Sequence, residues 1–129
     1  MNLPLFVYGT LKRSQKGMPH SLMRQARFLS RASMSGSLYD LGPYPGVFRN
    51  SAGGGRVFGE LYELPHHTGP RALQALDEYE GPEFRRRRVL VTLRGGRRRV
   101  AWTYVLRRRP EKHARLVPSG RYPSRRGAA

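Results

Sequence analysis

The sequence predicts an α+β fold, in the form of a small, mostly antiparallel β-barrel with flanking short helices. Several short segments have strand-like apolar patterns, one segment has helical periodicity, and the last third of the chain contains a clear β-hairpin. An antiparallel sheet that curls on itself buries one face in a shared core. The 129 residues suit one domain with one modest core. We expect that domain over residues 1–117, followed by a basic, Gly-, Pro- and Ser-rich tail over residues 118–129 that is flexible.

The first strand is expected at the apolar run Leu3–Tyr8, which ends at Gly9-Thr10. Gly9 has no Cβ, so the backbone there can turn or approach a ligand closely. Backbone N–H groups at such a turn can bind an anion. A Gly-Thr pair after a strand is nevertheless more often a plain turn, so this motif alone does not predict a site.

The middle of the chain reads as two extended segments, over residues 26–41 and 57–64. Residues 41–47 are turn-rich, and their prolines exclude a long regular element. Residues 51–55 include three glycines without the Lys-Ser or Lys-Thr that follows a phosphate-binding P-loop. The region therefore predicts strands joined by loops, without a nucleotide-binding motif.

One helix is predicted before the hairpin, with Pro70 in its first turn and Gly81-Pro82 at its end. Leu73 and Leu76 mark its buried side. At roughly 100° per residue, Glu80 falls about 20° from Leu73 and should also face the interior. Burial raises the pKa of a carboxylate and makes it a usable proton shuttle near neutral pH. The alternatives are an ion pair with an arginine of the 85–88 run or a frayed, solvated helix end, and the helix alone favours these.

The hairpin is predicted over residues 84–93 and 97–106, because Gly95-Gly96 supplies the positive φ angles of a tight turn. In its first strand, alternate residues are apolar on one face and mostly arginine on the other. In the second strand, the alternation of Val100, Trp102 and Tyr104 indicates the apolar face. The arginine runs are therefore interpreted as solvated strand faces.

The composition excludes several classes of function and leaves nucleic-acid binding open. The chain has no cysteine, which excludes disulfides, thiolate chemistry and cysteine-ligated metals. No apolar run reaches the roughly 20 residues of a membrane span, and the N-terminus does not resemble a signal peptide, so a cytoplasmic location is the expectation. The adjacent His66-His67 pair is assigned to a solvated loop, and we predict no metal and no cofactor.

The formal net charge of +17 makes nucleic acid a candidate partner. Nearly all of the positive charge is arginine, and the aromatic residues lie mostly at strand positions with a core pattern. Binding of bases would need exposed aromatics interleaved with the basic residues. Incidental basicity is therefore favoured over dedicated nucleic-acid binding, and the sequence does not predict an oligomeric state.

Two separated motifs resemble those of the γ-glutamylcyclotransferase-like superfamily, in particular its γ-glutamylamine cyclotransferase, or AIG2-like, branch. Residues 6–12, Phe-Val-Tyr-Gly-Thr-Leu-Lys, are similar to that family's Tyr-Gly-Thr-Leu motif. Residues 76–81, Leu-Asp-Glu-Tyr-Glu-Gly, resemble its Leu-Asp-x-x-Glu-Gly segment. Shorter matches follow in family order at residues 38–41, 45–46, 59–62, 101–105 and 119–122. The resemblance covers nearly the whole chain, and the joint order of the motifs carries its specificity.

The resemblance implies a cyclisation that releases 5-oxoproline and a free amine from a γ-glutamyl amine or γ-glutamyl amino acid. It implies that Glu80 is the catalytic acid and base, and that the loop Tyr8, Gly9, Thr10 and Leu11 binds the substrate. Further residues that the resemblance suggests for the cavity lining are Tyr39, Pro45, Gly46, Phe84 and Tyr122. The alternative is a basic binding protein on the same barrel that contacts nucleic acid or another acidic partner.

Overall fold

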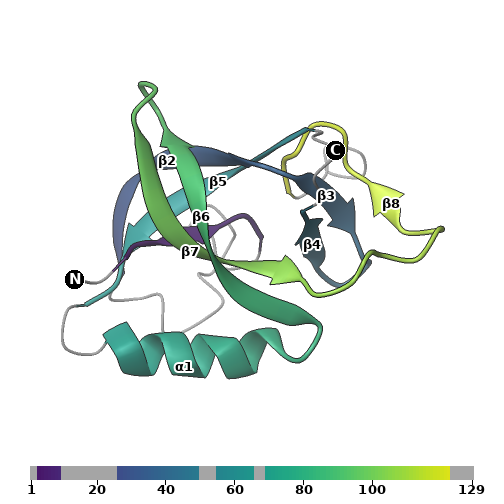
Figure 1. Cartoon of the computed structure of the whole chain (residues 1–129), viewed down its shortest axis with the longest axis horizontal. Helices are drawn as coiled ribbons and strands as arrows, with labels where there is room; N and C mark the ends of the chain where they lie inside the picture. Colours follow the sequence, from purple (N-terminus) through teal and green to yellow (C-terminus); the bar gives the residue numbers. More distant parts are fainter. Residues whose placement is uncertain (1–2, 10–25, 50–54, 66–68, 123–129) are drawn as a thin grey trace.

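The computed structural model of the chain describes residues 3–9, 26–49, 55–65 and 69–122 (Figure 1). The elements in these ranges are β1 (Leu5–Val7), β2 (Arg27–Ser35), β3 (Ser37–Asp40), β4 (Pro45–Phe48), β5 (Arg56–Glu63), α1 (Gly69–Glu80), β6 (Phe84–Leu93), β7 (Arg98–Leu106) and β8 (Arg115–Leu116). The predicted hairpin and the predicted helix with its end before Gly81 are confirmed.

The main sheet is a closed barrel with the strand order β1-β5-β2-β6-β7. Neighbours along this order are antiparallel, and the barrel closes where β1 runs parallel to β7 at Leu5↔Trp102. A second sheet, in the order β4-β3-β8, stands beside the barrel (Figure 1). The predicted α+β class with a small, mostly antiparallel barrel is therefore confirmed.

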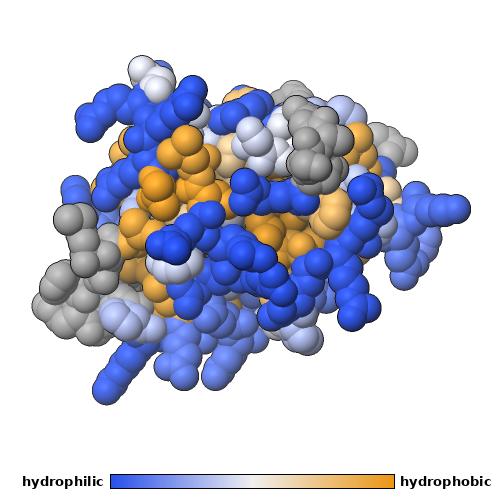
Figure 2. Space-filling view, viewed as in Figure 1, coloured by the Kyte–Doolittle hydropathy of each residue, from blue (hydrophilic) through white to orange (hydrophobic). Residues whose placement is uncertain are grey.

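The buried side chains form two clusters, one on each side of the barrel wall. The cluster inside the barrel includes Phe6, Met34 and Val91. The other packs between the wall and the remaining elements, and there Leu76 of α1 joins Leu5, Val7, Tyr62 and Tyr104. Helix α1 lies along one side of the barrel (Figure 1), where it covers apolar side chains that would otherwise face water. Seen from the same side, hydrophilic residues cover much of the surface, with apolar residues exposed between them (Figure 2).

The face assigned to β7 from its sequence is wrong at Val100, which is 43% exposed. Ala101, Thr103 and Val105 are the buried alternate positions that point into the barrel. Tyr104 lies on the opposite face and is buried because other elements cover it there. Val100 shares that outer face but lies towards the hairpin end, opposite Leu90, where no such cover reaches.

The glycines at the hairpin turn adopt the backbone that the sequence predicts, with φ of 99° at Gly95 and 95° at Gly96. The turn-rich segment 41–47 contains one short strand that sequence reasoning missed. This strand, β4, begins at Pro45 itself and pairs with β3. A proline fits there because it stands at the first position of a strand that has a partner on one side only.

The C-terminal segment remains attached to the domain beyond the boundary placed at Pro118. The amide of Val117 donates to Leu38 O at 2.8 Å, and the amide of Phe58 donates to Gly120 O at 2.8 Å. Gly120 has a φ of 70°, and a Cβ there would lie 1.8 Å from Arg56 O. Residues 118–122 thus pack against the sheets, while residues 123–129 lie outside the described residues. No helix in the described ranges is long and apolar enough to cross a membrane.

Candidate active site

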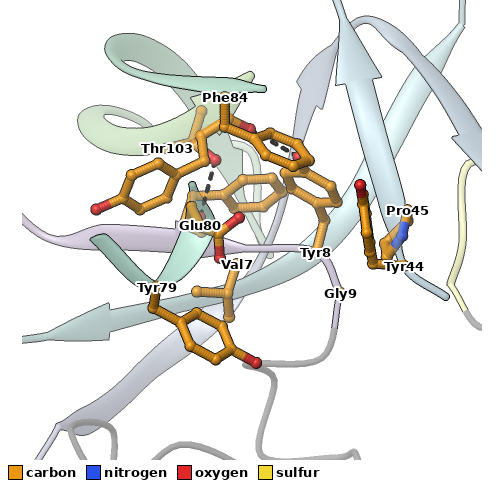
Figure 3. A pocket seen from close by; sticks show the side chains of 11 residues that line it. Val7, Tyr8, Gly9, Tyr44, Pro45, Tyr79, Glu80, Phe84 and Thr103 are labelled. Carbon is orange, nitrogen blue, oxygen red and sulfur yellow. Dashed lines mark hydrogen bonds between the residues drawn. The ribbon is translucent and has the colours of Figure 1, made fainter. Parts of the chain in front are cut away.

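A cavity of about 300 Å³ lies where the end of β1 meets the C-terminal end of α1 and the start of β4 (Figure 3). Its lining is mostly aromatic and contains one ionisable carboxylate. The lining residues are Phe6, Val7, Tyr8, Gly9, Tyr44, Pro45, Tyr79, Glu80, Phe84, Thr103 and Tyr104.

Glu80 is the last residue of α1, and its side chain lies among the cavity side chains, with Val7 and Tyr8 beside it (Figure 3). It follows the buried Ala72 and Leu76 at intervals of four residues, so the helix turns all three toward the barrel. Burial raises the pKa of Glu80 from 4.5 to about 7. Glu80 is therefore divided between its acid and base forms near neutral pH, which is the condition for moving a proton in both directions.

The arginine that could have neutralised Glu80 is held by another carboxylate. Arg86 Nε donates to Asp77 Oδ1 at 2.8 Å, and its guanidinium lies 4.3 Å from the centroid of the Trp102 ring. Among the described residues, no lysine or arginine forms a salt bridge with Glu80. The ion-pair alternative raised by the sequence thus applies to Asp77, three residues earlier, and the solvated-end alternative does not apply.

Asp77 also accepts a hydrogen bond from the hydroxyl of Tyr104 at 2.5 Å. Burial, together with this hydrogen bond and the Asp77 charge, raises the pKa of Tyr104 well above its ordinary value. The phenol therefore stays protonated and continues to donate. Asp77, Arg86 and Tyr104 together tie the last turns of α1 to β6 and β7, and this connection fixes the backbone that carries Glu80.

The buried hydroxyl of Tyr8 makes two hydrogen bonds. It donates to Tyr104 O at 2.7 Å and accepts from the amide of Val47 at 3.3 Å. Burial and the nearby charge of Glu80 both raise the pKa of Tyr8. The hydroxyl is thus a neutral structural link between three strands or their ends, and its ring forms one wall of the cavity.

Replacing Tyr8 with Phe should lower the free energy of unfolding by about 1–3 kcal/mol, because the change leaves a buried carbonyl and a buried amide without partners. Urea unfolding would measure the loss. Tyr39→Phe is the matched control, since Tyr39 is only partly buried and lies outside the cavity lining. Equal losses in the two variants would contradict the role given to the Tyr8 hydroxyl.

Several of the residues suggested by the sequence meet at this cavity and others do not. Glu80, Tyr8, Gly9, Pro45 and Phe84 line it. Gly9 approaches Pro45 so closely that a Cβ would lie 2.8 Å from the proline Cγ, which explains why the first strand ends at a glycine. Thr10 and Leu11 lie outside the described residues.

Three of the suggested lining residues lie elsewhere. Tyr39 of β3 pairs with Gly46 and with Leu116 of β8. Gly46 is buried where its Cβ would meet Leu106 at 2.9 Å. Tyr122 packs against the cluster inside the barrel. Each of the three supports the second sheet or its contact with the barrel.

The lining residues that sequence reasoning missed are Phe6, Val7, Tyr44, Tyr79, Thr103 and Tyr104. Thr103 is fully buried, and its hydroxyl donates to Phe6 O at 2.9 Å. Tyr44 donates to Glu83, and its ring meets that of Phe84 at an angle of 61°. Phe6 and Val7 precede Tyr8 in one short motif and Tyr79 precedes Glu80, but no pattern in the sequence marks their side chains as cavity-lining. Tyr44, Thr103 and Tyr104 reach the cavity because segments far apart in the sequence become neighbours.

Metal chemistry has no evident ligand set in the part of the chain that the structure describes. There, no group of three or more His, Asp or Glu side chains is placed to hold a metal ion. The His66-His67 pair lies outside the described residues.

Comparison with known proteins gives matches over most of the chain. A family profile described as "Gamma-glutamyl cyclotransferase, AIG2-like" matches residues 5–124. The γ-glutamylaminecyclotransferase of Bos taurus is 39% identical over an alignment of 106 residues, and this alignment covers 73% of this chain and 59% of the bovine protein. A protein of Vibrio cholerae serotype O1 with the provisional name γ-glutamylcyclotransferase is 31% identical over 118 residues, covering 90% of this chain and 91% of that protein. The chain therefore spans less than two thirds of the bovine relative but nearly all of the bacterial one.

The fold is shared with a solved structure as well. The crystal structure of an AIG2-like protein from Mus musculus superposes with a TM-score of 0.69 at 22% identity, covering 85% of this chain and 80% of that one. At this identity the likeness concerns the fold alone.

Proposed function

The chain belongs to the γ-glutamyl cyclotransferase, AIG2-like family, and from this premise we propose that it converts a γ-glutamyl amine or γ-glutamyl amino acid into 5-oxoproline and a free amine. Glu80 is the general base and then the general acid of this reaction. The observation that carries the proposal is a single carboxylate in the cavity lining whose pKa lies at about 7.

The reaction begins when the substrate's own α-amine, in its neutral form, attacks the γ-carbonyl carbon, and the attacking nitrogen must lose a proton to become the ring amide. Glu80 accepts that proton as the new C–N bond closes the five-membered ring. The carbonyl oxygen gains negative charge, and backbone N–H groups of the loop that begins at Tyr8 and Gly9 stabilise it. Because the nucleophile and electrophile belong to one molecule, holding it folded supplies much of the rate.

The second half of the reaction returns the proton. Protonated Glu80 donates to the departing nitrogen, the original amide C–N bond breaks, and the carbonyl re-forms in the ring. The products are 5-oxoproline and the free amine, and no water is consumed. The deprotonated form of Glu80 is restored at the end of each turnover.

The shape of the cavity suggests how the substrate is kept folded. Tyr44 and Phe84, with ring centroids 5.9 Å apart, form an apolar wall opposite the end of β1. Such a wall excludes water, which would otherwise solvate Glu80 and lower its pKa towards the ordinary value. The aromatic rings also favour the folded substrate over its extended form by limiting the available space.

The proposal is tested by measuring 5-oxoproline release from γ-glutamyl amines, including γ-glutamyl-lysine, and from γ-glutamyl amino acids. Release from at least one compound, with the paired amine in equal amount, is the expected result. The preferred compound would identify the leaving group. Absence of release across both classes by a folded protein would overturn the proposal.

The activity should depend on pH through Glu80. Only its base form can begin the reaction, so kcat/KM should rise as pH increases through about 7 and should level off above it. The measurement is a pH series of kcat/KM for the preferred substrate. A rise centred near 4.5, the ordinary value for this carboxyl group, would show that burial does not tune the base.

A further inference from the structure

A second cavity, of about 270 Å³, lies on the barrel away from Glu80, and no residue lines both cavities. It lies where β2 and β6 separate, since these strands pair only at Ala32↔Leu93 and Ser33↔Thr92. Its lining comes from four barrel strands and the residue that follows β4: Met34, Ser35, Arg49, Arg56, Val89, Leu90, Thr92 and Arg98.

The charge of this lining is entirely positive. Arg49, Arg56 and Arg98 line the cavity, and no acidic residue does. The salt bridges within the described ranges involve Arg27, Arg86, His113 and Arg115, so none of them neutralises a lining arginine. Three arginines thus line one space without a salt bridge to a carboxylate among the described residues.

Arg56 is held in place by neutral groups. Its Nη1 donates to Ser35 Oγ at 3.2 Å, and its Nη2 donates to Ser33 Oγ at 2.8 Å and to Thr92 Oγ1 at 3.2 Å. These hydroxyls belong to β2 and β6, so two strands orient a side chain that comes from β5. A hydroxyl fixes the guanidinium without cancelling its charge, and a fixed donor loses little freedom when an anion binds.

The number of arginines indicates the chemistry of the ligand. One guanidinium fork satisfies a carboxylate, whereas several arginines around one space match a group with more than one negative charge and several acceptor oxygens. Phosphate has both properties. Bases of nucleic acid would also need aromatic platforms, but Tyr79 is the one aromatic among the strongly exposed large apolar side chains of the described residues, and it belongs to the other cavity.

We propose that the cavity formed by Arg49, Arg56 and Arg98 binds a phosphate group of a small phosphorylated molecule. Arg56 is the fixed donor, and Arg49, just after β4, and Arg98 of β7 add charge. The exposed apolar residue Leu90 belongs to the same lining and suits the carbon part of such a molecule. This site is independent of Glu80, so it stands whether or not the chain turns over γ-glutamyl compounds.

Calorimetric titration with inorganic pyrophosphate at low ionic strength tests the proposal. Wild type should bind one equivalent, and Arg56→Gln and Arg98→Gln should each weaken binding by roughly tenfold or more through loss of a charge-assisted contact. Arg108→Gln is the matched control, because it removes the same charge from an exposed residue outside the lining. Thr92→Val removes one hydroxyl that orients Arg56 while keeping every charge, and it should weaken binding several-fold. Thermal melts of each variant establish that it is folded.

Two results would overturn the proposal. One is the absence of saturable binding to the wild type. The other is an equal loss of affinity in Arg56→Gln and Arg108→Gln, which would assign the effect to the diffuse charge of the surface. The source of the phosphate is tested by titrating an oligothymidylate in parallel. If its binding is unaffected by Arg56→Gln, the site takes small phosphates; if pyrophosphate displaces it and Arg56→Gln weakens it equally, the phosphate belongs to a nucleic-acid backbone.

Discussion

Replacing Glu80 with Gln is expected to lower the turnover of γ-glutamyl substrates by roughly 100- to 10,000-fold, the usual contribution of a general acid–base group. The amide keeps the size of the side chain but can neither accept the α-amine proton nor return it to the leaving nitrogen. Because Glu80 is partly buried and free of an ion pair with any described arginine, the change should leave the neighbouring contacts intact. The measurement is kcat for 5-oxoproline release.

The matched control is Glu78→Gln, which makes the same chemical change at an exposed position on the same helix. Its turnover should equal that of the wild type. A similar loss in both variants would mean that the charge of the helix matters and that Glu80 has no special role. Full activity in Glu80→Gln would remove Glu80 from the mechanism.

The pH dependence of the unfolding free energy of Glu80→Gln, compared with that of the wild type, is a second test of the role of Glu80. The folded state holds the Glu80 proton with a pKa of about 7, whereas the ordinary value is 4.5. The folded protein therefore binds more protons than the unfolded chain in this interval, and its stability falls as pH rises from 4.5 to about 7. Glu80→Gln has no such group, so the unfolding free energy of this variant should rise relative to that of the wild type as pH increases from 4.5 to about 7.

Replacing Leu76 with Ala is expected to lower the free energy of unfolding by about 2–5 kcal/mol, as for other fully buried leucines. Leu76 is 0% exposed and is the residue of α1 that packs most deeply against the barrel. The loss should appear as a lower urea midpoint with an unchanged slope. At temperatures below the melting transition, turnover should also decrease, because Glu80 lies one turn after Leu76 and is positioned by the same packing.

Gln74→Ala is the control for this prediction, because Gln74 is exposed on the same helix. It should change stability by less than about 0.5 kcal/mol. If Leu76→Ala were equally mild, the helix would not be held by its apolar side, and the position of Glu80 would need another explanation. A loss of turnover without a loss of stability would point to the same conclusion.

The sequence predicted the parts of the molecule that depend on local rules. Gly95 and Gly96 fix a tight turn, and Gly81 followed by Pro82 ends a helix, because these residues limit the backbone directly. The inward direction of Glu80 also follows from helical geometry alone. These features needed no knowledge of which strands become neighbours.

The remaining features depend on pairings between distant segments. From the sequence, Arg86 could pair with either Asp77 or Glu80. It forms its salt bridge with Asp77 because of how β6 is positioned beside α1. Likewise, Val100 is exposed because α1 does not extend over that part of the outer face. An alternation pattern in the sequence does not show which part of a face a helix covers. Tyr104 was expected as an ordinary strand residue, yet its carbonyl and hydroxyl serve Tyr8 and Asp77.

The closure of the barrel by β1 also determines the order in which the molecule can be made. Tyr8 and Tyr104, which are joined by a hydrogen bond, are 96 positions apart in the chain. During synthesis on a ribosome, β1 emerges before the other strands of the barrel. One of its edges pairs with β5, and the other stays unpaired until β7 has been made. Contacts of this span make folding slow, in the range of roughly milliseconds to seconds for barrels. The cavity is therefore among the last parts of the nascent protein to form, and premature release of the chain before β7 would leave Glu80 without the walls that tune it.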